Sequence, residues 1–106
     1  MKRYQDAILY LDKAIAIDKD FAYAWANRAF AKLMLGWLSD GKADNDRALE
    51  IDKTNGYIYR NEGIYLFEKG KYAEALAQFN KAKELEADVP LVDDYIWRAT
   101  KLLDSD

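Results

Sequence analysis

The 106-residue sequence matches itself when it is shifted by 34 residues. Equivalent residues recur three times at this spacing: Ala14, Ala48 and Ala82; Ile17, Ile51 and Leu85; Asp18, Asp52 and Glu86. A period of roughly 20–50 residues is typical of stacked structural units, each too small to bury a core of its own. The period therefore constrains the fold more strongly than any single motif in the chain does.

Apolar residues follow the three-and-four spacing of amphipathic helices along almost the whole chain. This spacing predicts an all-α chain of about six helices, over residues 4–17, 25–36, 38–52, 57–69, 72–86 and 90–103. The connections are short, so successive helices are expected to pack antiparallel, as helical hairpins.

Residues that are typical of helix ends agree with these helix boundaries. Gly36 and Gly70 stand where a helix is expected to end in a left-handed residue. Pro90, the only proline, is expected in the first turn of the last helix, where its missing N–H costs nothing. Three polar residues are expected to cap helix N-termini: Asp20, Asn55 and Asp88.

Each 34-residue unit combines a helix, a short turn and a second helix, and this pattern resembles the tetratricopeptide repeat. The clearest copy is 56–89, with Lys-Tyr-Ala-Glu-Ala-Leu at 71–76 and Phe-Asn-Lys-Ala at 79–82. The copy at 22–55 departs from the family pattern at Gly41 and Asn45, where looser packing or filling by a neighbour is expected. The resemblance implies a right-handed α-solenoid of antiparallel helical hairpins.

The repeat register also predicts the domain organisation. We expect a single domain over residues 1–106. Its parts are 1–21, the second helix of a partial repeat; 22–55 and 56–89, two complete repeats; and 90–106, a C-terminal capping helix.

Small residues are expected at the contact within each hairpin. Two helices approach to about 8–10 Å only where a facing side chain is small or absent. Ala29 is expected to face Gly41, and Gly63 to face Ala75. The aromatic residues nearby then belong to the core.

The family resemblance implies a binding surface. In this family the first helix of each repeat lines a concave face, which suits a peptide or helix of a partner protein. Carried over by register, the groove residues are Tyr23, Asn27, Phe30, Met34, Tyr57, Arg60, Asn61, Ile64, Phe67, Tyr95 and Arg98. An amide side chain both donates and accepts hydrogen bonds, so Asn27 and Asn61 could hold a peptide backbone, or could instead serve capping or hairpin packing.

Some relatives in this family clamp the C-terminal carboxylate of a chaperone with several basic side chains. Ala26 and Phe30 occupy places where the first basic and amide residues of that clamp would lie. The carboxylate-clamp interpretation is therefore not favoured.

The two ends of the chain depart from an ordinary array, because it starts with a second helix and ends with a first one. The first helix should carry an apolar strip without its usual partner, and Trp97 stands where complete repeats have Ala or Gly. Homo-oligomerisation is expected through Tyr4, Ile8, Leu9, Leu11, Ile15 and Trp97. Alternatively, the last helix is a simple cap, or the sequence belongs to a longer array in which another helix covers the strip.

Composition narrows the class of function. The chain has no histidine and no cysteine, so the usual general base and the usual zinc ligands are absent. The formal net charge of −3 disfavours nucleic acid and acidic membrane surfaces as partners, although single-stranded RNA stays an alternative because another family of helical hairpins reads it. We expect a non-enzymatic protein-binding scaffold without cofactor or metal, and a cytoplasmic location.

Overall fold

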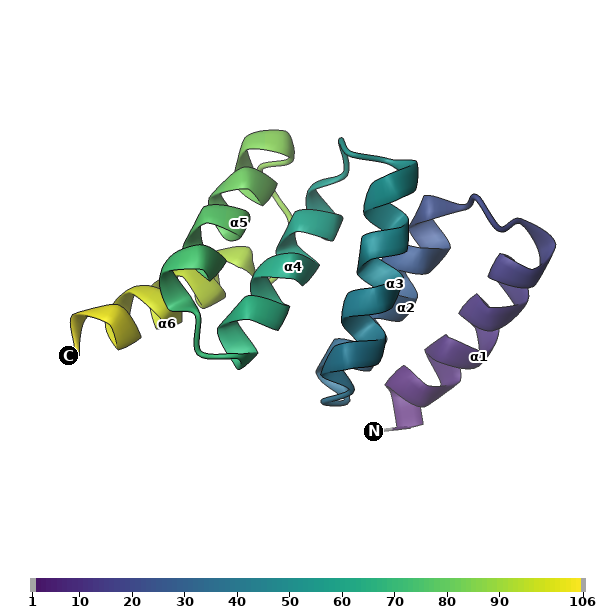
Figure 1. Cartoon of the computed structure of the whole chain (residues 1–106), viewed down its shortest axis with the longest axis horizontal. Helices are drawn as coiled ribbons and strands as arrows, with labels where there is room; N and C mark the ends of the chain where they lie inside the picture. Colours follow the sequence, from purple (N-terminus) through teal and green to yellow (C-terminus); the bar gives the residue numbers. More distant parts are fainter. Residues whose placement is uncertain (1, 106) are drawn as a thin grey trace. The chain divides into compact units, whose positions relative to one another are not determined.

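The structure, a computed structural model, describes residues 2–105, which form six α-helices and no strand (Figure 1). The helices are α1 (Lys2–Ile17), α2 (Ala22–Met34), α3 (Leu38–Ile51), α4 (Gly56–Glu68), α5 (Tyr72–Leu85) and α6 (Val92–Asp104). The prediction of an all-α chain of about six helices is confirmed. The chain divides into two compact units: unit 1 ends at Lys53 and holds α1–α3, and unit 2 begins at Thr54 and holds α4–α6.

In unit 1, α2 packs against both α1 and α3. A Cβ atom on Gly41 would lie 2.8 Å from Leu33 Cγ and 3.1 Å from the backbone oxygen of Ala29, so only glycine permits this approach of α2 to α3. Ala29 therefore faces Gly41 as the sequence predicts. Leu33 of α2 occupies the space beside Gly41, and Asn45 is buried, so a neighbour fills this part of the hairpin.

A cluster of ion pairs joins the three helices of unit 1. The buried carboxylate of Asp44 on α3 accepts hydrogen bonds from Arg28 Nε at 2.8 Å and Arg28 Nη2 at 2.9 Å, and it pairs with Lys32 Nζ at 3.0 Å. Arg28 Nη1 also donates to Asp12 on α1 at 2.8 Å. The hydrogen bond to Asp44 is the main cause that raises the pKa of Arg28, because charge-assisted bonds favour the charged guanidinium.

In unit 2, α4 packs against α5 and also contacts α6. A Cβ atom on Gly63 would lie 2.5 Å from Cε1 of the Phe79 ring, so the ring fills the space that the missing side chain leaves. The sequence placed Ala75 opposite Gly63, whereas the nearest side-chain atoms all belong to Phe79. Phe79 in turn stacks on Tyr95 of α6, with ring centroids 5.4 Å apart, and this ring pair is the centre of the unit 2 core.

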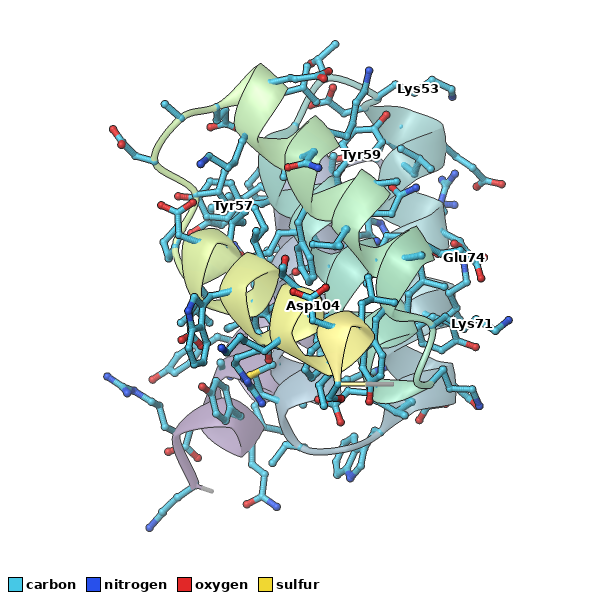
Figure 2. All side chains as sticks on the ribbon, turned by 90° about the vertical axis from the view of Figure 1, so that its left-hand side faces the viewer. Lys53, Tyr57, Tyr59, Lys71, Glu74 and Asp104 are labelled. Carbon is cyan, nitrogen blue, oxygen red and sulfur yellow. The ribbon has the colours of Figure 1, made fainter. Side chains whose placement is uncertain are left out.

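Cation–ring contacts show which side of α4 faces α5. Tyr57 and Tyr59 leave α4 toward different sides (Figure 2). The Lys81 ammonium of α5 lies 5.8 Å from the Tyr59 ring, while Arg60 of α4 itself lies 5.0 Å from the Tyr57 ring. Tyr59 therefore lies on the α5 side of the hairpin.

The predicted helix ends are partly confirmed. Gly36 and Gly70 adopt left-handed φ angles of 85° and 80°, and the side chain of Asn55 accepts a hydrogen bond from the Tyr57 N–H at 2.9 Å. The prediction of Asp20 as a cap is wrong. Phe21 holds the N-cap position of α2, and the Asp20 carboxylate pairs with Arg47 of α3 at 3.0 Å.

The start of the last helix also differs from the prediction. The helix begins at Val92, so Pro90 precedes it, and the N-cap is Leu91 in a left-handed conformation at φ 74° rather than Asp88. The Leu91 carbonyl accepts the first bond of the helix from the Tyr95 N–H at 3.0 Å, and the Pro90 carbonyl accepts from Arg60 Nη1 at 3.4 Å. Arg60 thus binds the turn that precedes α6, and Pro90 lies in this turn outside the helix.

Candidate functional site

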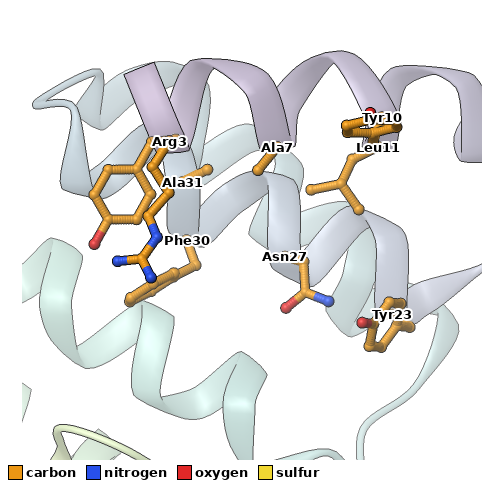
Figure 3. A pocket seen from close by; sticks show the side chains of 9 residues that line it. Arg3, Ala7, Tyr10, Leu11, Tyr23, Asn27, Phe30 and Ala31 are labelled. Atoms are coloured by element: carbon orange, nitrogen blue, oxygen red, sulfur yellow. The ribbon is translucent and has the colours of Figure 1, made fainter. Parts of the chain in front are cut away.

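A groove in unit 1 lies between α1 and α2 and encloses about 450 Å³ (Figure 3). Both helices contribute to its walls. The lining residues are Arg3, Tyr4, Ala7, Tyr10, Leu11, Tyr23, Asn27, Phe30 and Ala31.

The chemistry of the groove is mostly apolar. Tyr4 and Phe30 form an edge-on aromatic pair with ring centroids 6.1 Å apart, and Leu11 is half-buried between the helices. The polar groups are the Asn27 amide and the Arg3 guanidinium, and Figure 3 shows the Arg3 side chain reaching toward Phe30. Apolar walls with a few oriented polar groups can hold an apolar side chain and fix a neighbouring backbone or carboxylate.

Two smaller hollows also border α1. One of about 330 Å³ is lined by Ala14, Ile17, Asp18 and Phe21. Another of about 340 Å³ is lined by Asp6, Leu9, Tyr10 and Lys13 of α1. The surface of α1 is therefore less completely covered by its own unit than a hairpin helix normally is.

The predicted groove residues fall into two groups. In unit 1, Tyr23, Asn27 and Phe30 line the α1/α2 groove, whereas Met34 is half-buried and outside it. In unit 2, Tyr57 is half-buried and Arg98 is exposed. The remaining five are buried: Arg60, Asn61, Ile64, Phe67 and Tyr95.

The buried members have packing roles in unit 2. The Asn61 side chain is 0% exposed, and its oxygen accepts hydrogen bonds from Arg60 Nη2 at 3.2 Å and Arg60 Nε at 3.3 Å. Phe67 packs edge-on against Tyr72 and Tyr95, each with centroids 5.2 Å apart. The Phe67 ring contacts hold α4 against α5 and α6, and a role in ligand binding stays a prediction for the buried residues.

Arg98 covers the aromatic cluster of unit 2 from outside. Its guanidinium lies 4.9 Å from the Phe67 ring and 5.0 Å from the Tyr95 ring. Burial is the main cause that raises the pKa of Tyr95, and the negative charge of Glu68 adds to it. The phenol therefore stays neutral within the core.

The residues expected to mediate self-association differ in accessibility. Leu9 and Trp97 are each 62% exposed. Tyr4, Ile8 and Leu11 are half-buried, and Ile15 is buried. Self-association through them stays a prediction, with Leu9 and Trp97 the most accessible of the set.

Four lining residues of the groove were not predicted as site residues: Arg3, Ala7, Tyr10 and Ala31. For Ala7, the signal that could have found it is the repeat register. It places Ala7 in the same series as Gly41 and Ala75, which are both buried within hairpins. A helix of this register without a covering first helix exposes that series.

Neither a metal-binding cluster nor a membrane-spanning helix is found in the part of the chain that the structure describes. Across residues 2–105, no three acidic side chains gather closely enough to hold a metal ion. None of the described helices is both long and apolar enough to cross a membrane.

No family model matches the chain, but individual proteins do. It is 32% identical over 85 residues to the small glutamine-rich tetratricopeptide repeat-containing protein 2 of Mycosarcoma maydis, covering 80% of this chain and 24% of that protein. The chain spans a quarter or less of the length of the curated relatives that it matches.

Two solved structures extend the comparison to the fold. The Arabidopsis OM64 TPR domain is 30% identical, with a TM-score of 0.80 over 94% of this chain and 83% of that domain. The first TPR of Spaghetti (RPAP3), solved with the HSP90 peptide SRMEEVD, is 21% identical, with a TM-score of 0.81 over 97% of this chain and 82% of that one. The second likeness concerns the fold alone.

Proposed function

Because the chain belongs to the tetratricopeptide repeat family, we propose that it is a non-catalytic interaction module that binds a peptide or helical segment of another protein in the α1/α2 groove. The observation that carries this proposal is the groove itself. It is formed by two helices and walled by Tyr4, Leu11 and Phe30, with the Asn27 amide and the Arg3 guanidinium as polar anchors. Non-catalytic binding agrees with a sequence that lacks both histidine and cysteine.

Peptide binding is supported by what fold neighbours hold. The RPAP3 domain was solved with an HSP90 peptide. Another neighbour, TPR2B of yeast Sti1, was solved in a complex with an Hsp70 peptide. This chain offers a groove with apolar walls, so we propose a partly apolar peptide as its ligand class.

Filling the groove should abolish peptide binding. A phage-displayed peptide library selected on the immobilised full chain should yield peptides that bind Ala7→Trp at least tenfold more weakly than wild type, because the indole occupies the groove. Asn27→Ala, which removes only an amide, should weaken the same peptides severalfold. The matched control is Ala16→Trp, an equal increase in volume on the same helix at an exposed position outside the groove.

The Ala16→Trp control shows whether a loss of peptide binding is specific to the groove. Equal loss in Ala7→Trp and Ala16→Trp, with both variants folded by circular dichroism, would place binding elsewhere on the chain. A selection that enriches no peptide would reject the proposed function itself.

Self-association is a second candidate, favoured by exposed residues of α1. Three large apolar side chains of α1 are exposed, Leu9 at 62%, Tyr10 at 74% and Ile17 at 87%, and exposed apolar surface of this kind can mark an interaction site. Light scattering over a concentration series should then give a mass rising above 12.3 kDa, and Leu9→Lys should abolish the rise. A constant mass of 12.3 kDa at high concentration rejects this candidate.

A further inference from the structure

The α1/α2 groove of unit 1 corresponds to the space that α4 fills in unit 2. A shift of 68 residues, twice the repeat, relates α1 to α5 and α2 to α6. It brings Tyr4 onto Tyr72 and Asn27 onto Tyr95. In unit 2 the Phe67 ring of α4 lies between Tyr72 and Tyr95, 5.2 Å from each ring centroid. The equivalent place in unit 1 is the groove between Tyr4 and Asn27.

The α1 stripe, made of Ala7, Leu11 and Ala14, is less buried than the equivalent residues of α3 and α5. On α5, the positions that face α4 are 0% exposed: Ala75, Phe79 and Ala82. Their equivalents on α1 are all half-buried: Ala7, Leu11 and Ala14. The same series on α3, where α2 provides cover, is buried again: Gly41, Asn45 and Ala48. Of the three helices in this register, α1 alone has its stripe incompletely covered.

The charges at the two ends of the α1 stripe indicate the direction in which a helix docked on α1 would run. In unit 2, Glu86 follows α5, and its carboxylate accepts a hydrogen bond from the Gly56 N–H at the start of α4, at 2.7 Å. The equivalent of Glu86 is Asp18, which is exposed and borders the hollow at the C-terminal end of α1. Arg3 lies at the opposite end of the groove. A helix has a positive N-terminus and a negative C-terminus, so these charges fit a helix that runs antiparallel to α1.

The helix contacts within the two hairpins, α4 with α5 and α2 with α3, indicate which side chains a helix docked on α1 must carry. Gly63 has no room for a Cβ beside Phe79, and Phe67 follows it by four residues. The α2 helix repeats the arrangement with Ala29 and then Leu33, which packs on Gly41. The docking helix therefore needs a small residue, and a large apolar residue four positions later.

We propose that α1 and α2 bind an α-helix of another protein in the way that α5 and α6 hold α4. This proposal rests on the proposed function and specifies that the bound peptide is an α-helix. The helix runs antiparallel to α1, with its N-terminus at Asp18 and a small residue over Ala7 and Leu11. Its large apolar side chain enters between Tyr4, Asn27 and Phe30.

A second copy of the chain does not supply this helix through α6. By register α6 is the first-helix equivalent, but it carries Trp97 at the position of Gly63. At Gly63 even a Cβ atom would lie 2.5 Å from the Phe79 ring, so an indole at this register does not fit the α4–α5 contact that the docking helix is proposed to reproduce. The α6 helix of a second copy is therefore not the proposed occupant.

The test uses the chain's own α4 as the probe. A labelled peptide with the sequence of residues 55–69 should bind the full-length chain in fluorescence anisotropy, and its helix content should rise in circular dichroism on mixing. The peptide variants Gly63→Trp and Phe67→Ala should each bind at least tenfold more weakly. On the protein side, Ala7→Trp should abolish binding and Ala16→Trp should preserve it.

Each alternative outcome overturns the inference in a recognisable way. Binding that survives Ala7→Trp means that the peptide has replaced α4 in unit 2. If the residue 55–69 peptide does not bind while library peptides do, and these stay non-helical when bound, the proposed function holds and the helical mode is rejected. If no peptide of either kind binds, both proposals fail. A dimer that Ala7→Trp dissociates would show that a second copy fills the groove.

Discussion

Phe79→Ala is expected to lower the free energy of unfolding by about 3–5 kcal/mol, the range for removing a fully buried aromatic side chain. The ring is 0% exposed, stacks on Tyr95 and fills the space that Gly63 leaves. Its removal leaves a cavity in the middle of unit 2 that no neighbouring residue is placed to close. Chemical denaturation followed by far-UV circular dichroism measures the change. The exposed neighbour Asn80→Ala is the control and should change stability by less than about 0.5 kcal/mol.

A double-mutant cycle makes this prediction specific to the contact with Gly63. Gly63→Ala in the wild-type chain should be destabilising, because the new Cβ would lie 2.5 Å from the ring. In the Phe79→Ala background the same change should be neutral or stabilising, because the obstructing ring is gone. Additive effects of the two changes would mean that the ring does not hold this position.

Asp44→Asn is expected to lower the free energy of unfolding by about 3 kcal/mol, near the lower end for removing one partner of a buried ion pair. The change leaves Arg28 and Lys32 without the carboxylate that both contact at 2.8–3.0 Å, in a site where the Asp44 side chain is 7% exposed. The effect stays below the upper end of the range because Arg28 retains Asp12 as a partner.

The matched control is Asp46→Asn. Asp46 lies one half-turn along α3 and pairs with Lys42 at 2.8 Å, but its side chain is exposed, so its loss should cost less than about 0.5 kcal/mol. Denaturation curves for the two variants, measured in the same buffer, give the comparison. Equal effects would contradict the account of Asp44 as the anchor of unit 1.

The helices can be predicted well from the sequence, because the residues that recur in each repeat act within a single helix end or a single helix contact. Gly36 and Gly70 end helices since a left-handed residue is needed there, and Gly41 and Gly63 permit close helix contacts. The Asp44 cluster could not be predicted, because its partners come from three helices and their meeting depends on side-chain directions. The start of α6 was missed for a similar reason, since Arg60 of another helix binds the turn at Pro90.

The candidate site was predicted only in part. The resemblance led to the first helix of each repeat, and in unit 1 three of the residues it selected, Tyr23, Asn27 and Phe30, line the α1/α2 groove. In unit 2 the same rule selected core residues, because α6 covers the side of α4 that carries Phe67. Arg3 was missed because its role depends on how α1 lies against α2, which no spacing within α1 reveals.

Unit 1 is proposed to hold an open counterpart of the place that α4 occupies in unit 2. Amide chemical shifts of the isotope-labelled full chain, titrated with the residue 55–69 peptide, test it most directly. We expect shift changes that centre on Tyr4, Ala7, Leu11, Asn27 and Phe30, and that saturate at one peptide per chain. Changes centred on α5 and α6, or no changes at all, would contradict it.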